Sequence, residues 1–203
     1  SSSSASAAAS SNNNLLCAAA GRPTVARVLP LPASVGDDIQ DVETPSLCLD
    51  LDAFEQNIQT MERLMAPFPH VSVRPHAKSH KCSAIARLLQ QSSKVVKGVC
   101  CAKLVEVEAM IAGGVLDIHL SNEIIGISKL RRLARLIQLS GARVSVCVDS
   151  RLGVEQLNQA AQEFSVIIPT LVEVNVGQNR CGVSALAEVV SLSQLVCTYP
   201  NLK

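Results

Sequence analysis

Short apolar runs alternate with longer stretches of helical period along the chain from residue 44 onward. In the longer stretches, apolar residues recur every three or four positions, which places them on one face of a helix. Such alternation is typical of a parallel sheet whose strands are joined by helices. The pattern predicts strands at 47–52 and near residues 71, 95, 117, 143 and 170, and helices over 53–65, 83–89, 105–112, 129–139, 154–164 and 186–197.

Polar residues within the predicted strands bear on the choice between an open doubly wound sheet and a (β/α)₈ TIM barrel. Arg74, His76 and Lys78 share one face of a strand, and so do Glu173 and Asn175. Central strands of an open parallel sheet are buried on both faces and read as continuous hydrophobic runs. No GxGxxG dinucleotide signature follows any strand. We therefore predict an α/β fold of the barrel type.

The number of predicted strands is too small for a complete barrel. Five strands follow the segment at 47–52, and a sixth begins at the final residues NLK. A barrel typically has eight strands and about 250 residues. We therefore expect a partial barrel with five to six strands, which would be the front part of a longer protein.

Composition argues against two classes of partner. The 203 residues are 48% hydrophobic and 2% aromatic, with a formal net charge of +1. A nearly neutral chain exerts no general attraction on phosphate backbones, and few rings are available to stack on bases, so we expect no nucleic-acid partner. No apolar run reaches the roughly 20 residues needed to cross a bilayer, so we expect no membrane partner. The eight cysteines form no CxxC pair, which favours reduced thiols over a disulfide framework.

Residues 1–36 differ in composition from the rest of the chain. They are rich in Ser, Ala and Asn, contain Arg22 and Arg27, and include no acidic residue. This composition is typical of an organelle transit peptide, and the alternative is a disordered low-complexity segment. A transit peptide would direct the protein to a plastid or mitochondrion; otherwise we expect a cytoplasmic location. In either case the predicted fold occupies residues 37–203.

The stretch VSVRPHAKSHK (71–81) ends an apolar strand with five basic side chains. In a parallel barrel the carboxyl ends of the strands carry the chemistry, and Lys78 falls at such an end. Neighbouring positive charges and partial burial both disfavour the ammonium form of a lysine, and the neutral amine is the form that makes an imine with an aldehyde. The residues alone leave three alternatives open: a zinc pair of His76 and His80, a phosphate-binding patch, and a solvated basic loop.

A series of segments resembles one known family. The segments are TPSLCLDLDAFEQNI, RPHAKSHK, GVCCAKLVEVEAMIAGGV, DIHLSNEIIG, RVSVCVDS and VEVNVGQNRCGV, in this order between about Val42 and Val183. They resemble the D-threonine aldolase and D-serine dehydratase family, whose N-terminal domain is a barrel of the alanine racemase type (PLP fold type III). GVCCAK and SNE are more similar to the aldolase branch.

The resemblance implies a barrel that binds pyridoxal 5'-phosphate (PLP). The lysine of RPHxK, here Lys78, would carry the cofactor as an imine. The arginine of GxxRCGV, here Arg180, would lie near the cofactor ring and hydrogen-bond its 3-oxygen. Arg74, His76 and His80, which surround Lys78 in sequence, are predicted to contribute to cofactor binding.

The implied function is that of a lyase on a β-hydroxy D-amino acid. An aldolase would cleave the Cα–Cβ bond to give glycine and an aldehyde, and a D-serine dehydratase or a 3-hydroxyaspartate-cleaving relative is the alternative. Family members use a divalent metal near the β-hydroxyl group, and a homodimer is expected for the full-length protein. The other hypotheses are a non-enzymatic PLP carrier and an inactive fragment.

The chain departs from the family pattern at its end. The glycine-rich phosphate loop of the later strands is absent from these residues, and so is the C-terminal β-domain with its His-x-Asp or His-x-Cys metal pair. We therefore expect residues 37–203 to be the N-terminal part of the barrel, and we assign no metal ligand within this chain.

Overall fold

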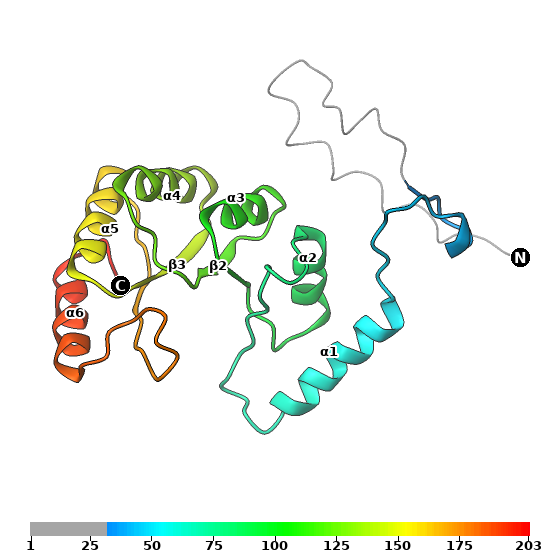
Figure 1. Cartoon of the computed structure of the whole chain (residues 1–203), viewed down its shortest axis with the longest axis horizontal. Coiled ribbons are helices and arrows are strands. Elements are labelled where there is room, and N and C mark those ends of the chain that lie inside the picture. The colour runs from blue at the N-terminus through cyan, green and yellow to red at the C-terminus, as the bar shows by residue number, and fades with distance from the viewer. Residues whose placement is uncertain (1–31) are drawn as a thin grey trace, which may run out of the picture. The chain divides into compact units, whose positions relative to one another are not determined.

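A computed structural model describes residues 32–203 of the chain (Figure 1). Most of the segment 1–36, for which a transit peptide was one interpretation, lies outside the described residues, so its role and the location of the protein stay predictions. The chain divides into two units, residues 1–54 and residues 55–203, which are treated separately below. Among the described helices, none is both long and apolar enough to cross a membrane.

The described part of the first unit contains a short 3-10 helix, η2 (Ile39–Asp41), and the first turn of α1 (Leu51–Met65). The strand predicted at 47–52 is wrong for this structure: residues 47–50 are irregular and α1 begins at Leu51. An alternating pattern needs a neighbouring strand before it forms a ladder, and the structure pairs no strand with these residues. The carboxylate of Asp50 instead accepts the backbone N–H of Ala53 at 2.9 Å, which stabilises the start of a helix.

The second unit is a parallel α/β assembly in which the strands follow one another in sheet order, β1-β2-β3-β4. All three pairs of neighbouring strands are parallel. The helical and strand periods therefore predicted the correct kinds of element, with boundaries that differ by a few residues. The elements are α2 (Ser83–Ser92), β1 (Val99–Cys101), α3 (Leu104–Ala112), β2 (Asp117–Leu120), α4 (Ile127–Ser140), β3 (Arg143–Val148), α5 (Arg151–Glu163), β4 (Thr170–Val172) and α6 (Leu186–Thr198).

Both edges of this sheet carry a further segment that is bridged rather than fully paired. The predicted strand at 71–77 meets β1 and the residues before it through two parallel bridges, Val73 with Val96 and His76 with Cys100. Pro75 lacks an N–H group, which limits it to accepting a hydrogen bond at an edge. At the other edge, Leu202 forms a single parallel bridge with Ile168, at the position where the sequence predicts the start of a sixth strand.

The two faces of the sheet differ in chemistry. Helices cover one face of the sheet (Figure 1). On that face Val99, Ile118 and Val144 are almost completely buried and pack in one apolar core. Because side chains alternate across a strand, Cys100 and His119 lie on the opposite face. One apolar and one polar face is the arrangement that the alternation of polar residues predicts for a barrel.

Gly98 fixes the approach of the first segment to the sheet. It has a left-handed φ of 62°, and a Cβ atom placed there would overlap the carbonyl oxygen of Asp117 and the guanidinium of Arg74. Gly141, which ends α4, has a similar φ of 68° but open space around it. A comparison of substitutions at these two glycines therefore separates the free-energy cost of a left-handed backbone from the cost of steric overlap.

We predict that Gly98→Ala destabilises the protein much more than Gly141→Ala. A non-glycine residue in the left-handed region costs about 1–2 kcal/mol, which applies to both variants. Overlap in a packed site adds a further ~1–3 kcal/mol, which applies only to Gly98. Chemical denaturation of both variants measures the difference, and equal losses of unfolding free energy would contradict the close approach at Gly98.

Candidate active site at the carboxyl ends of the strands

Lys78 lies at the carboxyl end of the first strand segment. The preceding residue, Ala77, is buried and donates its N–H to the carbonyl oxygen of Cys100 at 2.7 Å, which keeps the backbone beside β1. Lys78 itself is exposed. Its backbone N–H donates to Nδ1 of His76 at 3.3 Å. The fold thus presents a free primary amine at the end of the barrel where enzymes of this architecture place their active sites.

Arg74 lies away from Lys78, at the amino end of β2. Its guanidinium pairs with Asp117, the first residue of that strand, at 3.1 Å and 3.3 Å. Lys78 instead belongs to the turn that follows the strand segment, in which the N–H of Lys81 donates to the carbonyl oxygen of Ala77. In this structure the fold brings Arg74 to a structural ion pair rather than to the lysine.

A hydrogen-bonded layer crosses the polar face of the sheet between these two ends. Nδ1 of His119 lies 2.9 Å from the hydroxyl of Ser145, and Nε2 lies 3.7 Å from the thiol of Cys147. Burial lowers the pKa of His119, and burial raises the pKa of Cys147 to about 12. The pair therefore holds a neutral ring and a protonated thiol, which is not the state of a cysteine nucleophile.

Arg180 lies on a loop that leaves β4 and returns beside it through a bridge between Val174 and Val183. Asn175 shapes this loop, because its side-chain oxygen accepts the backbone N–H groups of Gly177 and Asn179, both at 3.0 Å. A loop that is tied together in this way holds the residues between its ends, including Arg180, over the carboxyl ends of the strands.

Three side chains orient the guanidinium of Arg180, whose Nε atom donates to the sulfur of the adjacent Cys181 at 3.3 Å. The guanidinium donates to the side-chain oxygen of Asn122, which follows β2, at 3.3 Å. It also lies 3.7 Å from a carboxylate oxygen of Glu173, which follows β4. Sequence reasoning identified Arg180 but missed these partners, because Asn122 stands 58 positions away in the chain.

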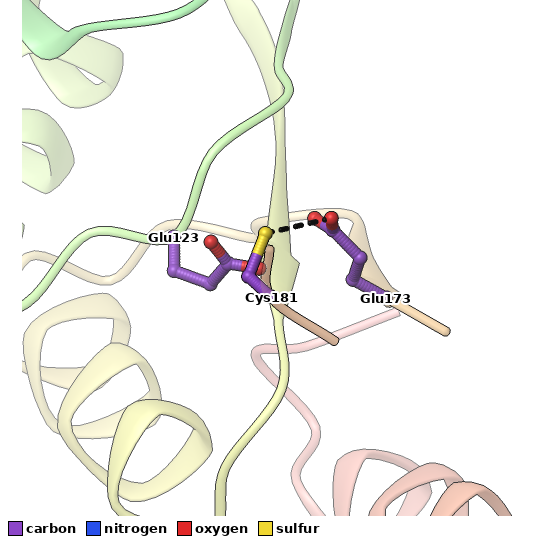
Figure 2. Close-up of side chains that lie close together, drawn as sticks. All are labelled: Glu123, Glu173 and Cys181. Carbon is purple, nitrogen blue, oxygen red and sulfur yellow. Dashed lines mark hydrogen bonds between the residues drawn. The ribbon is translucent and has the colours of Figure 1, made fainter. Parts of the chain in front are cut away.

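Glu123, Glu173 and Cys181 converge at the same end of the sheet, as Figure 2 shows. Their donor atoms all lie within 4.8 Å of one another, and the thiol of Cys181 donates to Glu173 at 3.0 Å. Burial raises the pKa of Glu123, whose Oε1 atom is buried without a hydrogen-bond partner among residues 32–203. The Cys181 hydrogen bond instead lowers the pKa of Glu173. The two carboxyl groups are thus biased toward opposite protonation states.

The donor atoms of this trio lie close enough together to hold a cation. A metal ligand must present a lone pair, so a cysteine ligand binds as the thiolate. The hydrogen bond to Glu173 raises the pKa of Cys181, and the pKa of Glu123 is raised as well. Binding of a cation here would therefore have to displace the proton of Cys181, and we assign no metal ligand in this cluster beside Arg180.

Comparison with known proteins places this geometry in a family. Residues 49–203 match the model for the alanine racemase N-terminal domain. The chain is 44% identical to a D-threonine aldolase from an Arthrobacter species over 86% of its length, and 40% identical to a 3-hydroxy-D-aspartate aldolase from Paracoccus denitrificans over 85%. The crystal structure of D-threonine aldolase from Filomicrobium marinum matches with a TM-score of 0.77 at 44% identity, covering 85% of this chain.

The chain matches only part of the length of each relative. The chain covers 45% of the Arthrobacter protein, 44% of the Paracoccus protein and 45% of the Filomicrobium structure. It thus spans less than half the length of the relatives that it matches. Within that span the fold matches that of the solved D-threonine aldolase, and the chain belongs to the alanine racemase N-terminal domain family.

Proposed function

We propose that the protein is a PLP-dependent lyase that cleaves the Cα–Cβ bond of β-hydroxy D-amino acids, as a D-threonine aldolase does. The observation that carries this proposal is the exposed amine of Lys78 at the carboxyl end of its strand, in a chain 44% identical to a D-threonine aldolase. The 40% relative is also named an aldolase, which supports bond cleavage over dehydration. Homodimer formation stays a prediction.

The residues present fit an aldehyde cofactor. Lys78 offers the primary amine that binds it covalently, and Arg180 offers N–H donors to an oxygen anion. Asn122 and Glu173 hold that guanidinium from two strands, so it is oriented before any ligand arrives. When bound, PLP supplies an electron sink for the pair of electrons released at Cα.

The carboxyl groups of Glu123 and Glu173 would then hold or release the protons that the reaction moves. Glu123 is biased toward the protonated form and Glu173 toward the ionised form. A carboxylic acid beside a carboxylate can pass a proton without involving bulk water. A divalent metal near the substrate hydroxyl also belongs to the proposal, with ligands that we do not assign to this chain.

We predict that borohydride reduction of the PLP-loaded protein fixes the pyridoxyl group on Lys78. Peptide mapping by mass spectrometry locates the label, and Lys78→Ala should abolish both labelling and turnover. Lys81→Ala is the matched control, because Lys81 belongs to the same basic turn. Labelling at another lysine, or no labelling at all, would contradict the proposed role of Lys78.

The aldolase reaction and its dehydratase alternative give different products from one substrate. From D-threonine, cleavage of Cα–Cβ yields glycine and acetaldehyde, whereas loss of the hydroxyl group as water yields ammonia and a 2-oxo acid. We predict glycine and aldehyde in equal amounts, measured by chromatography and an aldehyde assay. Ammonia and oxo acid as the main products would replace the aldolase with a dehydratase.

We predict that Arg180→Lys lowers kcat/KM by roughly 10- to 100-fold, because a charge-assisted hydrogen bond contributes about 1.5–3 kcal/mol. Lysine keeps the charge but lacks the planar guanidinium, whose Nη2 atom contacts Asn122 and Glu173 while its Nε atom donates to Cys181. Arg151→Lys is the control, since Arg151 is an exposed arginine in a surface ion pair with Glu155. Steady-state kinetics of both variants should separate them, and equal behaviour would remove Arg180 from the site.

A further inference from the structure

The two histidines that flank Lys78 direct their rings toward the backbone. Nδ1 of His76 accepts the N–H of Lys78 at 3.3 Å, and Nδ1 of His80 accepts the N–H of Cys82 at 3.2 Å. Each bond joins a ring to the backbone two residues later. A ring nitrogen accepts a hydrogen bond only when it carries no proton. Both rings are therefore neutral in this geometry, with their protons on Nε2.

Further contacts make the residues after Ala77 into a fixed turn. The N–H of Lys81 donates to the carbonyl oxygen of Ala77 at 2.7 Å, and the N–H of Ser79 donates to the carbonyl oxygen of His76 at 3.3 Å. Lys81 has a left-handed φ of 49°, which a side chain adopts only when its surroundings impose it. Lys78 thus projects from a turn whose amide groups are held by ring nitrogens as well as by backbone oxygens.

The surroundings of both rings favour the neutral state. Burial and then the positive charge of Lys78 lower the pKa of His76, while Glu106 on α3 opposes them. A charge on His76 also acts to lower the pKa of His119 on β2. Burial also lowers the pKa of His80, whose Nε2 atom is buried without a hydrogen-bond partner in the described structure.

We propose that His76 and His80 are positioning residues that hold the Lys78 turn through their Nδ1 atoms, so that the presentation of the Lys78 amine requires both rings to be neutral. Protonation would place a hydrogen on Nδ1, where a backbone N–H already points, and two donors would face each other. The consequence for catalysis rests on the proposed function, whereas the state of the turn is independent of any cofactor.

The direction of the pH dependence follows from the lowered pKa values. The folded protein binds fewer protons at these rings than the unfolded chain does, so folding of the turn is favoured at higher pH. This stabilisation is complete above the ordinary histidine pKa of 6.5 and decreases as the pH falls below it.

Amide hydrogen exchange on the cofactor-free protein tests the turn directly. We expect the amides of Lys78 and Cys82 to be protected above pH 6.5 and to lose about tenfold of that protection, after correction for intrinsic exchange, as the rings protonate. His76→Asn and His80→Asn keep an acceptor near the Nδ1 position that does not titrate, so protection should persist at low pH. His76→Leu and His80→Leu should lose it at every pH.

His70→Asn is the matched control, because His70 is exposed and precedes the strand segment. It should behave as the unmodified protein does. Unprotected amides at Lys78 and Cys82 above pH 6.5 would overturn the proposal, and so would asparagine variants that are no better than the leucine variants. The protection of the Lys78 and Cys82 amides is measured on the unmodified protein, so this test does not depend on whether a variant folds.

Cofactor attachment then separates this inference from the proposed function. With PLP present, the fraction of Lys78 trapped by borohydride should fall with the same pH profile as the amide protection, and the asparagine variants should remove that fall. Protected amides without any attachment of PLP would leave the turn in place and refute the proposed function. If PLP attaches to Lys78 equally well at every pH although the amides show that the turn opens at low pH, the positioning role of the histidines is refuted.

Discussion

Alternation of side chains across parallel strands is the constraint on which the rest of this structure depends. Burial of Ile118 and Val144 against the helices fixes which face of β2 and β3 is apolar, and the residues between them must then face the other way. His119 and Ser145 meet on that second face because the register pairs them. The apolar core and the polar face therefore both follow from the same alternation of side chains.

The parallel direction of the strands has the second large effect. Every carboxyl end lies at the same edge, so residues that follow different strands converge without any local sequence signal. Asn122 and Glu173 reach Arg180 in this way, and Glu123 and Cys181 join Glu173 beside it. An arginine that looks like a turn residue in sequence thus becomes an oriented guanidinium at the end of the sheet.

The sequence predicted most of the fold because its periods are strong in the second unit. Helices such as α4 and α5 bury one face each, and the residues that end or begin them are recognisable: Gly141 adopts a left-handed φ after α4, and the side chain of Ser150 accepts the N–H of Gly153 at the start of α5. The segment at 47–52 misled the prediction, since its alternation alone cannot supply a partner strand.

By itself, the sequence determined the order of strands and helices and the position of Lys78 at a strand end, because both depend on spacing along the chain. Only the tertiary structure decided that Arg74 pairs with Asp117 at the opposite end, and that two carboxyl groups and a thiol lie together beside Arg180. Arg74 and Asp117 stand 43 positions apart in sequence, and Glu123 and Glu173 follow different strands, so the distances within these pairs depend on strand register. No local pattern encodes that register.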